Sequence, residues 1–585
     1  VSVKCGKVAS FFFRNAFPDA SSRLGIVYTP IEVVDFIIRS TQELMTSELG
    51  TGLGEPGVKV LDPFTGTGTF VARLVESGVI DQKDLKAKFA EDVHANELVL
   101  LAYYIAAINV EETLNAKTGE YISFSGLVLT DTFQMYESKD GLDGLGVFED
   151  NNERVVRQQK QNIQVIIGNP PYSSGLTDAN STSQEVSYED LERRILETYS
   201  SASDSKSRAS LYNSYIKAFR WASDRVGENG IISFVTNGAW LDSKSADGVR
   251  QSFANEFSKI FVLNLKGNAN TLGEPRKRQG GNIFGSGSRS PVSITFLIRN
   301  SKMKGPALVS VYEVEDFLTQ EEKLATLQKA EHLKNLEFRT VKDPVHSDWI
   351  NLRNQKFEKF PLLFDQEHPE MGVFEAYSNG LKSNRDAWVY NWSKASLEKT
   401  MKASVSFYNS ALRSQSSAID DPTKISWDAR LRNRFSSGKQ VKFDPLAITT
   451  GLYRPFTKMN LYFDKDWNNS QYKLPQMWSP GMKQKFLVVA APSDTWSPGA
   501  LVTDVIPDKN VNGMFCFPLH RADSGNQEIS LFADEAGWAV NETFIKSVSQ
   551  IIGKKVTPEQ VFGYVFFVLN HPSYQAMFGT NLKKE

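Results

Sequence analysis

Short apolar runs alternate with stretches of helical spacing between residues 24 and 300. The runs are rich in β-branched and aromatic residues and have the length of buried strands; they lie at 58–61, 89–93, 127–129, 165–167, 231–235, 260–265 and 292–298. The apolar period of a helix recurs at 31–49, 70–75, 98–110 and 212–225. Strands that alternate with helices form βαβ units around a mainly parallel sheet. We therefore expect an α/β first domain.

The 585 residues are too many for one core, and the character of the sequence changes along the chain. Residues 173–210 are polar and Ser-rich, which predicts an inserted loop with one short helix. Beyond residue 346 many aromatic residues, short strand-like runs and turn signals indicate a mixed α+β domain that closes with a helical segment at 558–582. The expected organisation is an N-terminal extension at 1–23, a first domain at 24–305, a charged helical connector at 306–345 and a second domain at 346–585.

Composition excludes several classes of protein. Cys5 and Cys516 lie at opposite ends of the sequence, and the six histidines show no metal-ligand spacing, so we expect neither a disulfide framework nor a metal site. The longest largely apolar run, 98–110, is shorter than the ~20 residues of a membrane-spanning helix. The sequence shows no signal peptide, which favours the cytoplasm. It starts with Val, which suggests a removed tag or a piece of a longer chain.

The charge is unevenly distributed along the chain. The 66 basic and 68 acidic residues give a formal net charge of −2, yet residues 380–490 hold 18 Lys and Arg against 8 Asp and Glu, a net charge of +10. A local positive field is typical of a polyanion-binding face, although a solvated surface has the same composition. The aromatic residues Trp388, Trp392 and Phe456 of this segment are expected in the core rather than as stacking platforms.

A glycine-rich turn follows the first expected strand, in Val58-Lys-Val-Leu-Asp-Pro-Phe-Thr-Gly-Thr-Gly-Thr-Phe70. Gly66 and Gly68 let the backbone press against a ligand, and the next helix offers free N–H groups. Val71 stands where the dinucleotide fingerprint has its third glycine, so that fingerprint is incomplete. Asp62 suits a cationic or hydroxyl-bearing ligand better than a pyrophosphate. A turn that needs glycine only for its geometry is the alternative.

A rigid diproline loop follows another expected strand, in Ile166-Ile-Gly-Asn-Pro-Pro-Tyr172. Two consecutive prolines remove backbone donors and fix φ. The side-chain oxygen of Asn169 and the backbone oxygen of Pro170 form a pair of acceptors for one amino group, and Tyr172 offers a planar face. Because parallel sheets bind ligands at the carboxyl ends of their strands, we interpret this loop as a binding site rather than a stiff turn.

Together the two motifs resemble the amino-group methyltransferases that use S-adenosylmethionine. Their order, with Asp-x-x-x-Gly-x-Gly first, Asn-Pro-Pro-Tyr second and a large domain last, is similar to the gamma class of DNA N6-adenine methyltransferases. A Thr-Pro loop precedes the first motif in that class, and Leu24-Gly-Ile-Val-Tyr-Thr-Pro30 stands in its place. The resemblance implies a Rossmann-like fold and S-adenosylmethionine as the cofactor.

The resemblance also implies cofactor contacts. Those expected at the methionine end are Tyr28, Thr29, Pro30, Asp62, Phe64, Gly66 and Gly68. Glu97 would hold the ribose hydroxyls, with an ordinary carboxylate at a helix N-terminus as the alternative. Asp131 would accept from the cofactor's adenine amino group. Phe133 would stack on that adenine, although Thr132 stands where the family often has the aromatic residue.

The catalytic residues implied in this way are Asn169, Pro170, Pro171, Tyr172 and Phe284. The acceptors at Asn169 and Pro170 would bond the two hydrogens of a target amino group and favour a tetrahedral nitrogen whose lone pair faces the methyl group. A target base in a duplex has to be flipped out. Phe284 would then form a second wall opposite Tyr172; the alternative places Phe284 in the core below a flexible loop.

Basic and amide side chains are the expected DNA contacts. Four lie in the glycine-rich segment 267–289 and would meet phosphates: Arg276, Lys277, Arg278 and Arg289. Three more lie in the second domain, where Arg can read guanine and Asn can read adenine: Asn384, Arg385 and Arg454.

Four longer phrases narrow the resemblance to the Type ISP restriction-modification enzymes: Tyr212-Asn-Ser-Tyr-Ile-Lys-Ala-Phe-Arg-Trp221, Gly281-Asn-Ile-Phe-Gly-Ser-Gly-Ser-Arg289, Ser383-Asn-Arg-Asp-Ala-Trp-Val-Tyr390 and Leu452-Tyr-Arg-Pro-Phe456. Those enzymes join a nuclease, a helicase-like translocase, a methyltransferase and a target-recognition domain in one chain. The resemblance covers essentially all of this chain from about residue 11, but it covers only the last two of these four parts, and no Gly-x-x-x-x-Gly-Lys-Ser/Thr motif occurs. The nuclease and helicase-like parts are therefore expected in a longer protein.

The predicted function is adenine N6 methylation in a specific sequence of double-stranded DNA, within a restriction-modification system. Two alternatives stay open at this point. Asn-Pro-Pro-Tyr also occurs in RNA and protein amino-group methyltransferases, which act on a similar planar amino group. A non-catalytic DNA-recognition module with a relic cofactor pocket is the other.

Overall fold

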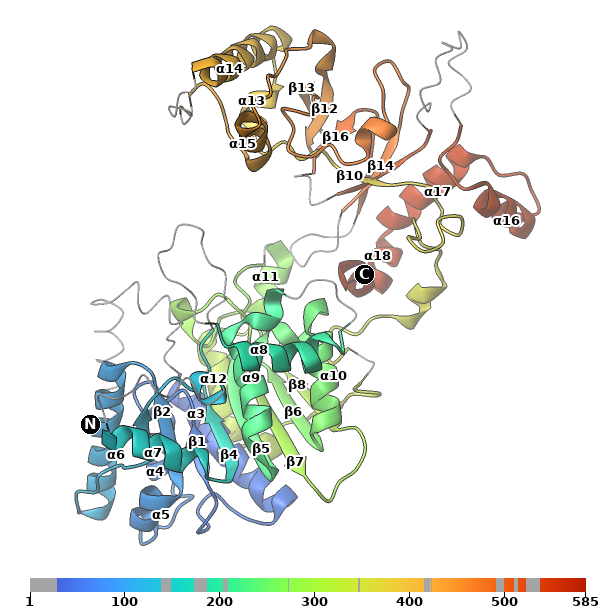
Figure 1. Cartoon of the computed structure of the whole chain (residues 1–585). Coiled ribbons are helices and arrows are strands. Elements are labelled where there is room, and N and C mark those ends of the chain that lie inside the picture. The colour runs from blue at the N-terminus through green and yellow to red at the C-terminus, as the bar shows by residue number, and fades with distance from the viewer. Residues whose placement is uncertain are drawn as a thin grey trace. The chain divides into compact units, whose positions relative to one another are not determined.

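The computed structural model describes residues 29–137, 149–172, 187–203, 209–271, 273–345, 348–414, 421, 423–490, 499–509, 514–521 and 537–584. The chain divides into two units, Val1–Leu352 (unit 1) and Arg353–Glu585 (unit 2), and each has its own hydrophobic cores (Figure 1). The expected residue Tyr28 lies outside the described residues.

Nine strands in the described part of unit 1 form one sheet, in the order β3-β2-β1-β4-β5-β7-β6-β8-β9. The strands β3, β2, β1, β4 and β5 pair in parallel, whereas β7 pairs antiparallel with both β5 and β6. Their bounds are β1 (Val60–Asp62), β2 (Val93–Glu97), β3 (Leu127–Leu129), β4 (Ile163–Gly168), β5 (Val226–Asn237), β6 (Lys259–Asn264), β7 (Val292–Asn300), β8 (Leu308–Glu313) and β9 (Arg339–Thr340). The mainly parallel α/β sheet that the sequence predicts is confirmed.

Helices cover both faces of this sheet (Figure 1). Along β5, Ile231 and Val235 belong to one core, and Ile232 and Phe234 belong to the core on the other face. A strand buried on both faces reads as a continuous apolar run, which is why it is recognisable in the sequence. The helices are α3 (Ile31–Leu44, followed by a π-helical turn at Met45–Leu49), α4 (Thr69–Glu76), α5 (Leu85–Glu91), α6 (Leu100–Thr118), α7 (Glu149–Gln159), α8 (Glu189–Ile195), α9 (Ser214–Arg225), α10 (Asp247–Glu256), α11 (Gly273–Gln279) and α12 (Gln320–Ala330).

Two segments of unit 1 differ from the sequence-based expectation. The expected strand at 89–93 begins only at Val93, because Phe89 packs into the core from helix α5. The segment 306–345 is not purely helical: it contains α12 but also β8 and β9, which extend the sheet beyond β6. Val309 and Val311 alternate along β8 and are buried in the core, which explains the strand.

The expected loop 173–210 holds α8, while 173–186 and 204–208 lie outside the described residues.

Unit 2 is a mixed α+β unit, as expected, with two four-stranded sheets among its described residues. Their orders are β10-β17-β14-β15 and β11-β13-β12-β16. The strands are β10 (Ser378–Asn379), β11 (Tyr390–Asn391), β12 (Ile448–Arg454), β13 (Thr457–Tyr462), β14 (Phe486–Val489), β15 (Ala500–Thr503), β16 (Ile506–Pro507) and β17 (Phe515–Pro518). The helices are α13 (Asp386–Val389), α14 (Lys394–Ser414), α15 (Ala429–Ser436), α16 (Glu542–Ile552), α17 (Pro558–Asn570) and α18 (Pro572–Lys584).

Two aromatic side chains of unit 2 are exposed, contrary to the expectation that they are core residues. Trp392 is 72% exposed and Phe456 is 88% exposed, whereas Trp388 is partly buried. Phe456 occupies the turn between β12 and β13, so its ring lies beyond the paired residues of the two strands. Within the described part of the chain, no helix has the length and apolar content needed to cross a bilayer. The same residues contain no group of three or more His, Cys, Asp or Glu side chains that could hold a metal ion.

Candidate active site

The candidate site lies where the carboxyl ends of four adjacent strands meet. The strands β3, β2, β1 and β4 are neighbours in the sheet and end at Leu129, Glu97, Asp62 and Gly168. The connections from β1 lead to β2 on one side, while β4 lies on its other side, so the strand order reverses at β1. Ligands bind open α/β sheets at such a switch point. The topology thus places the glycine turn and the diproline loop next to each other.

Asp62, the last residue of β1, is almost completely buried. Its Oδ1 accepts a hydrogen bond from the Phe64 N–H at 3.1 Å, and its Oδ2 has no hydrogen-bond partner among the described residues. Burial, with the nearby Glu97 carboxylate, raises the pKa of Asp62 to about 8. A side chain on Gly168 would place its Cβ 2.8 Å from Asp62 Oδ1 and would force the carboxylate to shift, so glycine leaves room for Asp62 where β4 passes it. A buried carboxylate with an open acceptor fits a ligand that carries a positive charge or a donor.

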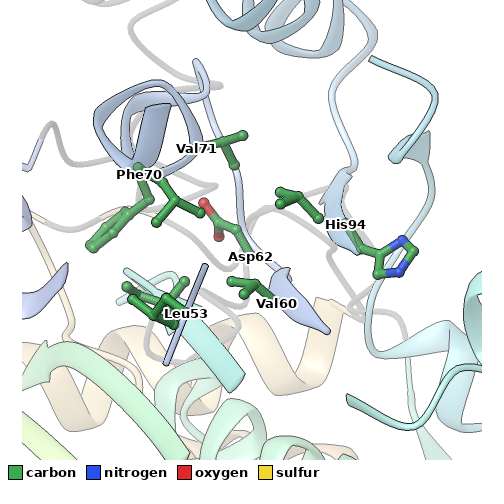
Figure 2. Close-up of a pocket in the computed structure, with 9 residues that line it drawn as sticks. Leu53, Val60, Asp62, Phe70, Val71 and His94 are labelled. Carbon is green, nitrogen blue, oxygen red and sulfur yellow. The ribbon is translucent and has the colours of Figure 1, made fainter. Parts of the chain in front are cut away.

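An apolar cavity adjoins Asp62 (Figure 2). Leu53, Phe70 and Val71 are among the side chains that line it, and the Asp62 carboxylate lies between them. His94 contributes to the lining, but its imidazole points away from Asp62 in Figure 2. Burial lowers the pKa of His94 to about 4, so this side chain is neutral at physiological pH and provides no counter-charge. Burial in these apolar surroundings is the main cause of the raised pKa of Asp62.

The glycine turn is held by Glu97 from the end of β2. Gly66 has φ 57° and Gly68 has φ 83°, both in the region that favours glycine. The Gly66 N–H donates to Glu97 Oε2 at 2.8 Å, and the Val99 N–H donates to Oε1 at 2.7 Å. Burial raises the pKa of Glu97 to about 7. A Cβ on Gly68 would lie 3.2 Å from Ala106 of α6, so this glycine also permits the helix to pack against the turn.

Asp131 follows β3 and is held by Tyr188, a residue for which the sequence predicts no role. Its Oδ1 accepts from the Phe133 N–H at 2.9 Å, and its Oδ2 accepts from the Tyr188 hydroxyl at 2.7 Å. The Phe133 ring is 7% exposed and lies 5.5 Å from the Phe64 ring and 5.4 Å from the Tyr188 ring, measured between centroids. Tyr188 stands in the polar stretch expected as a loop, which carries no pattern that would single it out.

The diproline loop is fixed by a hydrogen bond to the start of α3. Asn169 Nδ2 donates to Thr29 Oγ1 at 2.9 Å, and Thr29 itself is buried next to Pro30, the N-cap of α3. Because the amide nitrogen faces Thr29, the amide oxygen faces the other way. Pro170 is buried, while Asn169 and Pro171 are partly exposed. Residues 29 and 169, far apart in sequence, therefore act together to orient one carbonyl group.

Tyr172 and Phe284 lie together but do not form two facing walls. Their ring centroids are 5.8 Å apart with an interplanar angle of 72°, an edge-to-face contact. Phe284 is 8% exposed and belongs to the core of unit 1, as in the alternative considered for it. Tyr172 Oη is buried and has no hydrogen-bond partner within the described residues, and burial raises its pKa well above the ordinary value. A base could enter between the two rings only if they separated.

The glycine-rich segment around Phe284 is a structured loop. Asn282 Nδ2 donates to the carbonyls of Gly267 and Ser290, which draws the ends of the loop together. Lys323 Nζ, from α12, donates to the carbonyls of Gln279 and Gly281 at 2.8 and 2.7 Å. The basic residues of this loop are on or beside α11: Lys277, Arg278 and Arg289 are exposed, and Arg276 is partly exposed and donates to the Gly280 carbonyl.

The three expected DNA contacts of unit 2 differ in exposure. Asn384 is exposed, and its φ of 56° lies in the left-handed region. Arg454 is partly exposed and forms an ion pair with Asp386 at 3.2 Å. Arg385 is 4% exposed, forms an ion pair with Asp428 at 2.5 Å and lies over the Trp467 ring. Arg385 thus supports the core of unit 2 and does not present a surface to DNA, which departs from the sequence-based expectation.

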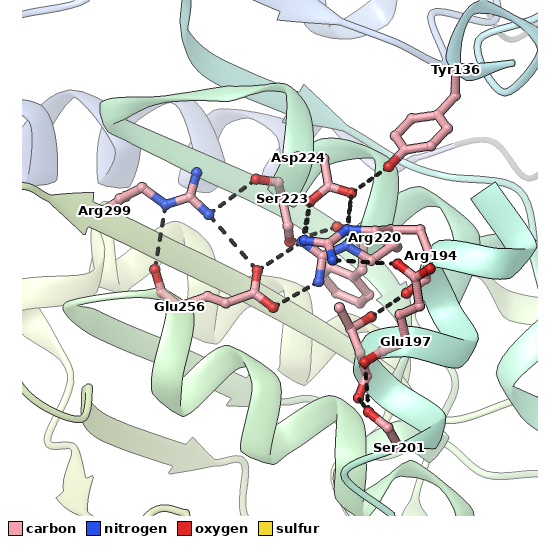
Figure 3. Close-up of polar contacts among 11 residues, drawn as sticks. Tyr136, Arg194, Glu197, Ser201, Arg220, Ser223, Asp224, Glu256 and Arg299 are labelled. Atoms are coloured by element: carbon pink, nitrogen blue, oxygen red, sulfur yellow. Dashed lines mark hydrogen bonds and ion pairs between the residues drawn. The ribbon is translucent and has the colours of Figure 1, made fainter. Parts of the chain in front are cut away.

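An ion-pair network links the Asp131 loop to the helices on one face of the sheet (Figure 3). Tyr136 donates to Asp224 Oδ2 at 2.8 Å. Arg220 on α9, with 1% of its side chain exposed, pairs with Asp224 and with Glu256 of α10. Arg194 of α8 also pairs with Asp224, at 3.2 Å. The network connects four segments and lies beside the loop that carries Asp131.

Known proteins and protein families resemble this chain in both of its units. The Eco57I restriction-modification methylase family matches residues 87–270, and the Type ISP C-terminal specificity domain matches residues 372–585. The ATP-dependent Type ISP restriction-modification enzyme LlaBIII bound to DNA aligns with 99% of the chain at 33% identity and a TM-score of 0.82. The chain belongs to the Type ISP restriction-modification family.

Two further solved structures align with this Type ISP chain. A nuclease-deletion mutant of the Type ISP enzyme LlaGI, in complex with a DNA substrate mimic, covers 100% of it at 32% identity with a TM-score of 0.81. A DrdV–DNA complex covers 99% at 32% identity with a TM-score of 0.83. The chain spans 57% of the DrdV chain, 46% of the LlaGI chain and 39% of the LlaBIII chain. The comparison with curated proteins gave no match.

Proposed function

We propose that this Type ISP chain transfers a methyl group from S-adenosylmethionine to the N6 amino group of an adenine in double-stranded DNA. The observation that carries the proposal is the pairing of Asn169 with Thr29 at the end of β4, beside the buried Asp62 at the end of β1. This arrangement holds a carbonyl acceptor rigidly next to a carboxylate that lacks a full set of partners. The methylase and specificity families matched by the two parts of the chain support it.

The residues around Asp62 fit S-adenosylmethionine, which would supply an electrophilic methyl group on a positively charged sulfur. Asp62 offers the open acceptor Oδ2 within its apolar surroundings. Glu97 has lone pairs for hydroxyl groups beside the bonds that it accepts from Gly66 and Val99. Asp131 is fixed by Phe133 and Tyr188 and is the proposed acceptor for the cofactor's amino group. Further proposed contacts are Tyr28, Thr29, Pro30, Phe64, Gly66, Gly68 and Phe133.

The diproline loop would bind the target amino group. The exocyclic nitrogen of adenine is a weak nucleophile because its lone pair is delocalised into the ring. Acceptors at Asn169 Oδ1 and at the Pro170 carbonyl would bond its two hydrogens and favour a tetrahedral nitrogen. The bond from this nitrogen to the methyl group would form as the bond from the methyl group to sulfur breaks, and the surplus proton of the methylated nitrogen would pass to water. This is catalysis by positioning and by fixed dipoles, and it needs no general base in the loop. Tyr172 would stack on the flipped base, and Phe284 would have to move from its edge-to-face contact to take part.

Duplex DNA is the proposed macromolecular substrate. The three similar solved structures are complexes with DNA or a DNA mimic, and residues 380–490 of the specificity part carry a net charge of +10. In unit 1, the cations on and beside α11 are proposed to meet phosphates, which contribute affinity and register but no sequence information. Because the similar chains are longer, we propose that nuclease and helicase-like parts adjoin this chain in the complete protein.

Methyl transfer tests the proposal. The wild-type chain, incubated with S-adenosylmethionine carrying a tritiated methyl group, is expected to label mixed-sequence duplex DNA. Asn169→Ala should reduce labelling by about a hundredfold or more while cofactor binding persists. Asn162, an exposed residue directly before β4, offers a matched control at the opposite end of the strand: Asn162→Ala should keep full activity. Labelling of RNA or protein but not of DNA contradicts the substrate, and cofactor binding without any transfer favours a recognition module.

A further inference from the structure

The β12–β13 hairpin of unit 2 presents a bulky apolar side chain at its tip. Phe456 is 88% exposed, and its φ of 62° lies in the left-handed region. A bulky side chain is rare and strained in that conformation. Packing in the core of unit 2 does not explain the residue, because the ring is outside the core. An aromatic side chain in this turn therefore needs a reason other than the stability of the unit.

A second exposed aromatic residue lies toward the same end of the sheet. β11 pairs antiparallel with β13, with Tyr390 opposite Leu461 and Asn391 opposite Asn460, so β11 runs toward the hairpin tip. Trp392 directly follows β11 and is 72% exposed, and its carbonyl accepts from Asn460 Nδ2 at 2.9 Å. Phe456 and Trp392 together are called the tip surface below.

Cations flank the tip, although acidic neighbours partly balance them. Arg454 lies over the Tyr453 ring at 4.0 Å and pairs with Asp386. Lys458 pairs with Asp504 at 2.5 Å, and half of its side chain is exposed. The surrounding segment 380–490 nevertheless carries a net charge of +10, which attracts a polyanion. The tip itself offers rings rather than charge, so what it can contact on a nucleic acid is the bases.

We propose that the tip surface contacts bases of duplex DNA and that Phe456 inserts at a base step as an apolar wedge. The inference rests on the proposed function, and it names a contact through which the specificity domain meets its substrate. Proteins that open or kink a duplex insert apolar side chains, Phe among them, between stacked bases. A wedge has to stand clear of its own protein, and the strained turn keeps Phe456 clear. Among the proposed DNA contacts of unit 2, the tip surface takes the place of Arg385, which is buried.

Phe456→Ala in the full chain tests the wedge. The probe is the duplex that the wild-type chain enriches from a random-sequence pool, and affinity is measured by fluorescence anisotropy over a range of salt concentrations. Loss of aromatic stacking should weaken binding by about tenfold to a hundredfold. Because an uncharged side chain releases no counterions, the slope of log affinity against log salt should stay at the wild-type value.

Leu446→Ala is the matched control. Leu446 is 80% exposed and lies in the helical turn Pro445–Ala447 that precedes β12, at the end of the hairpin opposite to the tip, so its removal should leave DNA affinity unchanged. Phe456→Trp keeps a planar ring and should bind as the wild type does. Phe456→Gly relieves the left-handed strain and should melt no lower than the wild type while it loses DNA affinity, which separates lost contact from misfolding.

The outcomes separate the wedge from the proposed function. Unchanged affinity in Phe456→Ala, or an equal loss in Leu446→Ala, overturns the wedge while DNA recognition stands. A changed salt slope in Phe456→Ala also overturns it, because the contact would then be ionic. If the wild-type chain enriches no duplex at all, the proposed DNA substrate fails, and the wedge fails with it.

Discussion

At the residue scale, the candidate site is dominated by carboxylates whose pKa values are raised by burial. Burial raises the pKa of Asp62 to about 8 and that of Glu97 to about 7. A folded protein that holds protons more tightly than its unfolded chain loses stability as pH rises, here between about 4 and about 8 for Asp62. Perturbed carboxylates concentrate at functional sites, where a ligand supplies the missing partner.

Cofactor affinity should therefore depend on pH. A positively charged ligand binds the ionised form of Asp62, so the affinity for S-adenosylmethionine should rise as pH increases toward 8, by up to about tenfold per pH unit. Asp62→Asn cannot ionise and should flatten this dependence, leaving only the contribution of Glu97 near pH 7. Titration calorimetry between pH 6 and pH 8.5 measures both. A wild-type affinity independent of pH would remove Asp62 from the cofactor site.

Asp131 should determine whether the site prefers an adenine ring. Asp131→Ala removes the proposed acceptor, and a lost hydrogen bond to a charged group weakens binding of S-adenosylhomocysteine by about tenfold to a hundredfold. The inosine analogue, in which an oxygen replaces the amino group, should lose little. Tyr188→Phe is the control, since it removes the hydroxyl but leaves the Asp131 carboxylate held by the Phe133 N–H. Equal losses for both ligands in Asp131→Ala would contradict the assignment.

At the element scale, the network in Figure 3 joins α8, α9 and α10 to the loop that follows β3. Arg220 Nη1 and Nη2 donate to the Glu256 carboxylate at 2.7 and 2.8 Å, and the same guanidinium pairs with Asp224. Tyr136 donates to Asp224 and so connects the Asp131 loop to this buried cation. The three helices and the loop that carries Asp131 are therefore joined by contacts to the same Arg220–Asp224 pair.

Arg220→Met should destabilise unit 1 strongly. The change fills the volume but leaves two carboxylates without their buried partner, which costs about 3–5 kcal/mol. Arg194→Met, at a side chain that is 40% exposed, removes a peripheral pair with Asp224 and should cost less than about 1 kcal/mol. Denaturant unfolding followed by circular dichroism measures both free energies. Similar costs for the two variants would mean that the network is not centred on Arg220.

At the scale of the whole molecule, the two units have separate hydrophobic cores. The proposed cofactor residues all lie in unit 1, and the match to the specificity domain lies wholly within unit 2. We expect two transitions in differential scanning calorimetry. S-adenosylhomocysteine at about a hundred times its dissociation constant should stabilise only the transition of unit 1, by about 2.7 kcal/mol. A single transition that shifts as a whole would show that the units unfold together.

The elements of unit 1 were largely predictable because each carries a local signal. β1, β4 and β5 are buried on both faces and therefore appear as continuous apolar runs, and the glycine turn and diproline loop are short motifs at their ends. β9, only two residues long and exposed, carries no apolar run and exists through its pairing with β8. The role of Tyr188 was equally unpredictable from the sequence, because it depends on a hydrogen bond to Asp131, which is 57 residues away along the chain.

The sequence by itself determined the alternation of strands and helices up to β7, the two motifs and the family resemblance, because periodicity and turn chemistry are local properties of the chain. Only the tertiary structure decided which side chains meet and which are exposed. It paired Asn169 with Thr29, buried Arg385 against Asp428, brought Phe284 edge-to-face with Tyr172 and left Phe456 in solvent. Such contacts and exposures depend on the packing of distant segments, which no local pattern of residues encodes.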